Sequence, residues 1–129
     1  MASKETRETF KAVTGERSTS LAQAVLVALG TVFKAQRRLA ELKERWLAEN
    51  QIDARVGSRL DAVRDRLEVG DGSREGCAKT LVDGAKAGAE LAEHLVAIGK
   101  DDLAAPIAEI THALHAVRLE LLSHDSPGD

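Results

Sequence analysis

An unbroken heptad seam runs through residues 19–49 and constrains the fold more than any other feature of the sequence. Its apolar members recur at alternating intervals of four and three residues: Leu21, Val25, Ala28, Val32, Ala35, Leu39, Leu42 and Trp46. A 3.5-residue repeat that continues for more than three heptads is typical of a helix packed lengthwise against other helices. We therefore expect this segment to belong to a helical bundle.

The composition supports an all-α fold. Hydrophobic residues make up 43% of the 129-residue chain, and alanine and leucine supply most of them, whereas aromatic residues make up only 2%. Alanine and leucine are strong helix formers, and strand formers are comparatively scarce. The shortage of aromatic rings also argues against a site that stacks bases or sugars, because such a site usually needs two or more rings.

Start and stop signals divide the chain into helices. Ser73 follows a glycine-rich break, and Asn50 and Gly99 are helix-ending residues. We predict a short, loosely packed N-terminal helix at residues 1–17 and a disordered tail at residues 124–129. Between them, a single domain over residues 18–123 holds a bundle of four main helices, at about residues 19–49, 52–69, 73–99 and 101–123.

The first half of the helix at 19–49 is apolar nearly all round. Leu26, Leu29 and Phe33 form a second stripe beside the seam, and Val27 adds another apolar position. A helix of this kind normally lies at the centre of a bundle or at an oligomer interface. We expect it to be the central helix, with the second stripe contributing to an interface.

Two further helix faces are unusual for their small residues. Gly84 and Gly88 lie inside a predicted helix, where each glycine costs about 1 kcal/mol relative to alanine. We expect close approach of a neighbouring helix to compensate, with Ala92 on the same face. The predicted helix at 101–123 has a second face poor in charge, which supplies three more candidate interface residues: Ala108, His112 and Leu119.

Glu109, His112 and His115 form the best metal-like pattern in the sequence. Glu-x-x-His on a bundle helix is one element of a carboxylate-bridged di-iron site, but the second such element is missing. The helical phase also turns the three residues away from the core stripe. A solvated or interface-facing histidine pair is the favoured interpretation, a metal site is the alternative, and no cofactor is predicted.

Charge is distributed unevenly, with +1 for residues 1–33, +3 for 34–66 and −7 for 67–129. In the basic middle, Arg55, Arg59 and Arg66 share one side of a predicted helix, which is a candidate nucleic-acid contact. The same stretch holds six acidic residues and the whole chain carries −3, so the attraction to phosphate would be modest. A solvated, ion-paired face is favoured over nucleic-acid binding.

The single cysteine and the longest apolar run bear on location. Cys77 cannot form an internal disulfide, which is compatible with a reducing compartment, and its place on an apolar stripe favours a buried structural role. Residues 21–33 are apolar-rich, but a membrane-spanning helix needs about 20 such residues. We therefore expect a cytoplasmic protein without a transmembrane segment.

Together these patterns predict a non-enzymatic interaction or assembly protein that self-associates through its apolar and small-residue helix faces. A homodimer is favoured, and a different protein partner is compatible with the same faces. Three alternatives stay open. They are a small DNA-binding regulator of the plasmid or phage type, an amphipathic protein that coats an apolar surface, and a metal-binding bundle.

Overall fold

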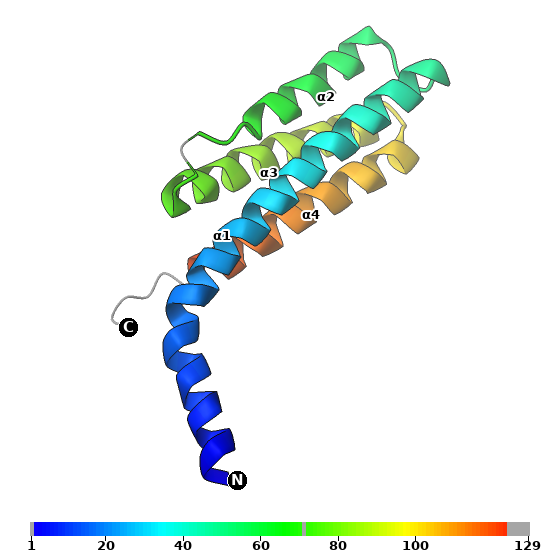
Figure 1. The fold of residues 1–129 in the computed structure, drawn as a ribbon. Helices are drawn as coiled ribbons and strands as arrows, with labels where there is room; N and C mark the ends of the chain where they lie inside the picture. Colours follow the sequence, from blue (N-terminus) through cyan, green and yellow to red (C-terminus); the bar gives the residue numbers. More distant parts are fainter. Residues whose placement is uncertain (1, 71, 124–129) are drawn as a thin grey trace.

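The computed structural model describes the backbone of residues 2–70 and 72–123, and the side chains of residues 21–70 and 72–123. Within that part the chain forms only helices, namely α1 (Ala2–Ala48), α2 (Ala54–Arg66), α3 (Arg74–Ala97) and α4 (Asp101–Ser123). The predicted all-α bundle of four main helices is confirmed (Figure 1). The separate N-terminal helix expected at residues 1–17 is not found, because the backbone of residues 2–17 continues α1 without a break, while the side chains there lie outside the described part. The tail at 124–129 lies outside it entirely.

The four helices follow one another around the bundle with alternating directions (Figure 1). Each helix contacts the next in sequence, α4 returns to pack on α1, and α1 also contacts α3 across the bundle, whereas the backbones of the described residues of α2 and α4 do not approach closely. As expected of a central helix, α1 contacts all three other helices. Short connections make sequence neighbours antiparallel neighbours in space, so α1 occupies one corner of the bundle and keeps an outward face.

The core consists of the predicted stripes. On α1 the seam is buried from Ala28 to Trp46, while Leu21 and Val25 at its start are half-buried. The narrow stripe on α2 and the leucine and isoleucine stripe on α4 complete one continuous cluster. Its largest fully buried side chains come from all four helices and one loop: Trp46, Leu39, Leu42, Leu60, Leu67, Leu81, Leu95, Ile107, Leu114 and Leu121.

Polar side chains and left-handed residues set the helix ends. Asp53 caps α2 and Ser73 caps α3, and each accepts a 3.0 Å hydrogen bond from the backbone N–H three residues later. Asn50 (φ 57°) ends α1 and Gly99 (φ 79°) ends α3. After each of them the next backbone N–H bonds back five residues, at 2.7 Å, which is the Schellman closure.

Helix α2 ends at Arg66, three residues before its predicted end at 69. Two side chains from neighbouring helices donate hydrogen bonds to the backbone carbonyls just beyond this end. Gln36 Nε2 donates to the Leu67 carbonyl at 3.0 Å, and Thr80 Oγ1 donates to the Glu68 carbonyl at 3.4 Å. At 1.5 Å per residue, α2 is about 20 Å long and α3 about 36 Å, so α2 covers only part of its neighbours.

The two mid-helix glycines of α3 lie where neighbours approach closely. A Cβ added at Gly84 would lie 3.0 Å from Leu67 Cγ and would collide with the end of that side chain. One added at Gly88 would collide with the hydroxyl of Thr111 on α4. Ala92 is half-buried one turn further on. The space that the glycines leave is therefore filled by this chain's own side chains.

Candidate interaction surface

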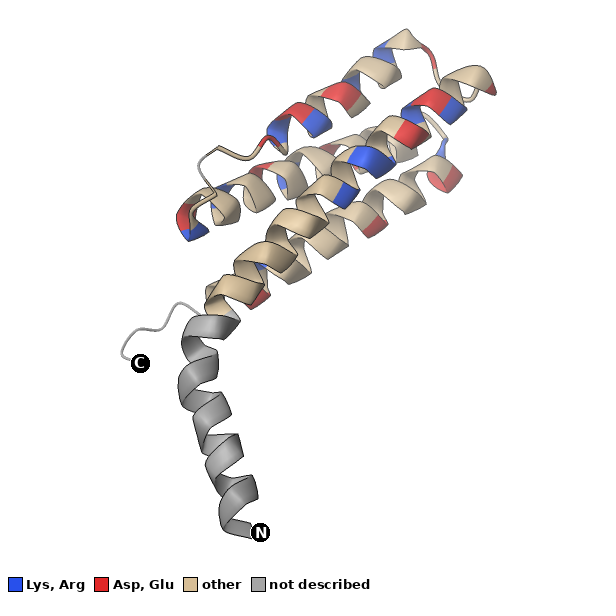
Figure 2. Ribbon diagram, viewed as in Figure 1, with Lys and Arg blue, Asp and Glu red and all other residues tan. Residues whose placement is uncertain are grey.

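The N-terminal described half of α1 carries an apolar face that no other element of the described chain covers. Residues 21–33 contain no charged side chain, and in Figure 2 they form the uncharged stretch that precedes the first basic band of α1. Leu26, Val27 and Phe33 are 66%, 56% and 54% exposed. Large apolar side chains rarely cluster in this way on a soluble monomer unless the patch makes contacts.

This face lies beside the side of α1 on which α2 packs. Farther along α1, Gly57 of α2 packs against Lys43 and Leu47, and the bond from Gln36 marks the level at which α2 ends. At 100° per residue, Leu29 points in nearly the same direction as Leu47. Leu26, Gly30 and Phe33 are turned about 40–100° away from that direction. They share the outward side of α1 with Arg37, Glu41 and Glu44, which are exposed farther along the helix.

Leu29 differs from the two residues with which it was grouped. Leu26 and Phe33 are exposed, whereas Leu29 is half-buried and packs against the bundle's own core. The predicted stripe is therefore divided. Leu29 supports the internal core, and Leu26 and Phe33 remain available to a partner.

Gly30 lies in the middle of the uncovered face. Taking 100° per residue, its Cα direction is opposite that of the fully buried Leu39. A Cβ added there would meet no atom within 4 Å, in contrast to Gly84 and Gly88. We call the residues around Gly30 the α1 outer face, which consists of Gln23, Leu26, Val27, Gly30, Phe33, Lys34 and Arg37. All are exposed except the half-buried glycine.

Basic residues stand at one end of this face. Lys34 and Arg38, with Arg37, border an open groove between α1 and α4. Ala35, Ile110 and Ala113 give the groove apolar walls, and Glu41 and Glu109 add acidic groups. The charge is thus gathered where the apolar stretch ends, while the other end of the α1 outer face is uncharged.

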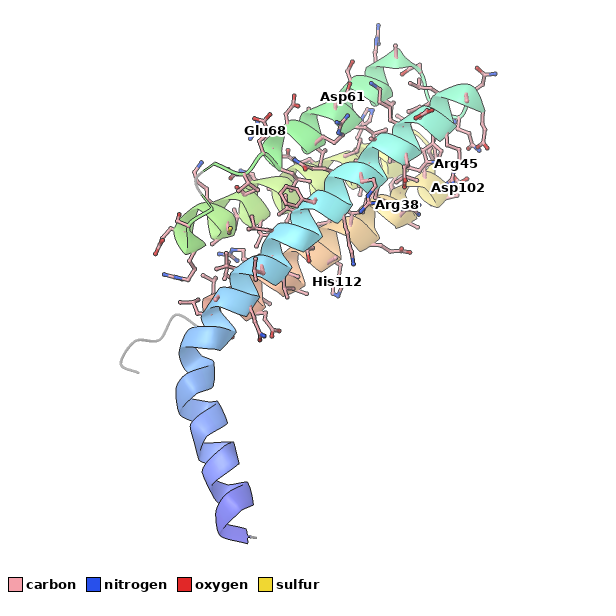
Figure 3. The ribbon with its side chains drawn as sticks, viewed as in Figure 1. Arg38, Arg45, Asp61, Glu68, Asp102 and His112 are labelled. Carbon is pink, nitrogen blue, oxygen red and sulfur yellow. The ribbon has the colours of Figure 1, made fainter. Side chains whose placement is uncertain are left out.

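The outward face of α4 is a second, smaller candidate. Ala108, His112 and Leu119 are all exposed, with Leu119 at 53%. Figure 3 shows His112 pointing outward from α4. A shallow groove between α3 and α4 adjoins this face and includes Val96, which is 52% exposed.

The metal-like pattern on α4 does not close into a ligand set. Glu109, His112 and His115 are all exposed. Among the residues with described side chains, no group of three histidine, cysteine, aspartate or glutamate residues is placed to hold a metal ion. The three side chains therefore belong to the outer surface of α4.

The arginines of α2 lie on a mixed surface. Arg55, Arg59 and Arg66 are exposed, and Figure 2 shows acidic and basic positions alternating along α2. Asp61 in the same helix lies 2.7 Å from Lys43 Nζ of α1 and 3.6 Å from Arg64 Nη1. Cys77 is buried in the core, as its place on an apolar stripe predicted.

Sequence reasoning missed Gly30, Val96 and Ile98. The last two are 52% and 43% exposed at the end of α3. Gly30 could have been found from the sequence, because it lies within an uncharged run. Such a run indicates a helix face that is suited to burial. The helical phase relative to the seam would have placed that glycine opposite the buried side.

Comparisons with known proteins add no relative. No family model matches the chain, and no curated protein or solved structure matches it either. Within the described residues, none of the helices combines the length and apolarity needed to cross a membrane.

Proposed function

We propose that this chain is a non-catalytic, cytoplasmic helical-bundle protein that self-associates, as a dimer, through the α1 outer face. The observation that carries the proposal is the exposure of Leu26, Val27 and Phe33, each more than half exposed within an uncharged stretch. Burying such side chains contributes about 25 cal/mol per Å² of apolar surface removed from water. Folding of the single bundle does not gain this free energy, because these side chains stay in contact with water.

The rest of the chain supports an assembly role. The main apolar stripes of the four helices are buried in the bundle's own core, and Leu67 and Thr111 occupy the space beside the two α3 glycines. Outside α1, the exposed large apolar side chains of the described chain are Val96, Ile98 and Leu119. The single cysteine, Cys77, is buried and cannot form an internal disulfide, which is compatible with a reducing compartment. The α1 outer face gathers three exposed apolar side chains within one uncharged stretch of helix.

Sedimentation equilibrium over a series of protein concentrations tests the proposal. We expect the wild-type chain to form a reversible dimer and the double variant Leu26→Glu/Phe33→Glu to be monomeric. Because both side chains are exposed, the variant should keep the circular dichroism spectrum and melting temperature of the wild-type monomer. This design avoids Leu29, whose substitution would also damage the core.

Leu119→Glu on α4 is the matched control, since Leu119 is exposed to a similar extent. We expect it to leave the dimer intact. A dimer that Leu119→Glu dissociates and Leu26→Glu/Phe33→Glu does not would move the interface to α4. A wild-type chain that stays monomeric at every concentration would refute self-association.

A further inference from the structure

The α1 outer face has the features of a surface that fits a second copy of itself. Gly30 is at its centre, with open space where a side chain would be. Leu26 and Val27 lie on one side of Gly30 along the helix, and Phe33 lies on the other. A glycine flanked by large apolar residues allows the backbone of another helix to come close while its neighbours interlock.

An antiparallel arrangement matches this order. If a two-fold axis passes Gly30, each position before the glycine lies opposite the position equally far after it on the partner copy. Phe33 then lies opposite Val27, and Leu26 lies opposite the aliphatic stem of Lys34. An isologous contact of this kind uses one patch on both subunits and closes as a dimer.

The placement of charge selects between antiparallel and parallel pairing. Lys34 and Arg37 are exposed at one end of the α1 outer face, and Gln23 is at the other end. In parallel pairing, Lys34 and Arg37 would each lie opposite the same residue of the partner copy, and the like charges would repel each other. Antiparallel pairing sets Arg37 against Gln23 and separates the two copies of Arg37 by 14 residues, about 21 Å along the helix. That distance exceeds the screening length of about 8 Å at physiological salt.

We propose that two copies pair α1 against α1 in the antiparallel sense, with the two-fold axis at Gly30. This inference rests on the proposed self-association and adds its geometry. The described face is about 20 Å long, from Gln23 to Arg37. Its seven residues are far fewer than the roughly 20–30 residues per side of a standard stable interface. The dimer is accordingly expected to be reversible, with a dissociation constant in the micromolar range or higher.

Cysteine cross-linking tests the geometry in the full-length chain. Gly30→Cys should give an oxidised dimer, because position 30 faces its own copy. Phe33→Cys alone should cross-link poorly, whereas an equimolar mixture of Val27→Cys and Phe33→Cys should give the mixed dimer. The native Cys77 is buried, so the wild-type chain under the same oxidation is the control for it.

A charge variant gives an independent readout. Gln23→Glu places a carboxylate opposite Arg37 of the partner subunit in the antiparallel arrangement, and should tighten the dimer about two- to five-fold at low salt. Adding Arg37→Ala to the same chain should remove the gain. In a parallel pair, Gln23→Glu would face its own copy and weaken association instead.

The outcomes separate the geometry from self-association itself. Efficient self-cross-linking of Phe33→Cys, or a weaker dimer with Gln23→Glu, would overturn the antiparallel arrangement. A chain that sediments as a dimer but cross-links at none of these positions would also overturn it, while self-association would stand through another face. A monomeric wild-type chain would refute both.

Discussion

Residues 21–33 and 34–48 belong to one continuous helix and share one buried seam, yet the rest of their surface differs. In the second half, α2 covers one side, and the exposed positions are mostly charged, such as Arg37, Glu41 and Glu44. In the first half the exposed positions carry no charge at all. A heptad seam identifies which face of a helix is buried within the bundle, but the outward face shows whether the helix also faces a partner.

The largest expected effect separates the buried seam of α1 from its outer face. Leu39→Ala in the covered half removes a fully buried side chain and should lower the free energy of unfolding by about 2–5 kcal/mol. Leu26→Ala makes the same chemical change at a position that is 66% exposed and should alter it by about 0.5 kcal/mol or less.

Urea denaturation followed by circular dichroism measures both variants, at a protein concentration that keeps the chain monomeric. The comparison fails if the two substitutions lower the free energy of unfolding by the same amount. Equal, large losses would mean that the first half of α1 is covered by the chain itself.

Replacing glycine by alanine should change stability in opposite directions at Gly84 and at Gly30. At Gly84, an added methyl group would meet the fully buried side chain of Leu67, and overpacking of this kind costs about 1–3 kcal/mol, more than the roughly 1 kcal/mol gained in helix propensity. At Gly30 the space is open, so Gly30→Ala should stabilise the monomer by about 0.5–1 kcal/mol.

Thermal melts of dilute protein give the sign directly, since 1 kcal/mol shifts the midpoint by a few degrees in a domain of this size. A fall in the melting temperature for Gly30→Ala would show that an unseen neighbour already occupies the space. A rise for Gly84→Ala would show that Leu67 repacks without strain.

A smaller effect concerns the end of α2. Gln36 Nε2 donates to the Leu67 carbonyl at 3.0 Å, so Gln36→Ala leaves that carbonyl without its partner. Loss of a single hydrogen bond of this kind should cost about 0.5–1.5 kcal/mol. Gln23→Ala, at an exposed glutamine of the uncovered half, is the control and should be neutral in the same urea titration. Equal stability of the two variants would remove Gln36 as the residue that fixes where α2 stops.

Much of the fold followed from the sequence, because the apolar stripes and the helix-ending residues act locally. Asn50, Ser73 and Gly99 mark their helix ends through their own backbone or side-chain geometry. The early end of α2 did not follow, since it depends on Gln36 and Thr80, which reach it from other helices. The exposure of the second stripe on α1 could not be decided from the sequence for a similar reason. An all-round apolar helix can be covered on every side by its neighbours or can keep an exposed face, and only the observed exposure of Leu26 and Phe33 distinguishes the two.

The smallest expected effect tests electrostatics in the covered half. Lys43 Nζ lies 2.7 Å from Asp61 Oδ2, but the two side chains are 31% and 41% exposed, so solvent screens the pair. Lys43→Met keeps an unbranched apolar stem beside Gly57 and removes the charge. The free energy of unfolding should fall by about 0.5 kcal/mol or less, and the loss should vanish at high salt. Lys34→Met, at an exposed lysine of the α1 outer face, should leave monomer stability unchanged at both low and high salt. A loss for Lys43→Met that persists at high salt would assign the contribution of Lys43 to packing between α1 and α2 instead of to its charge.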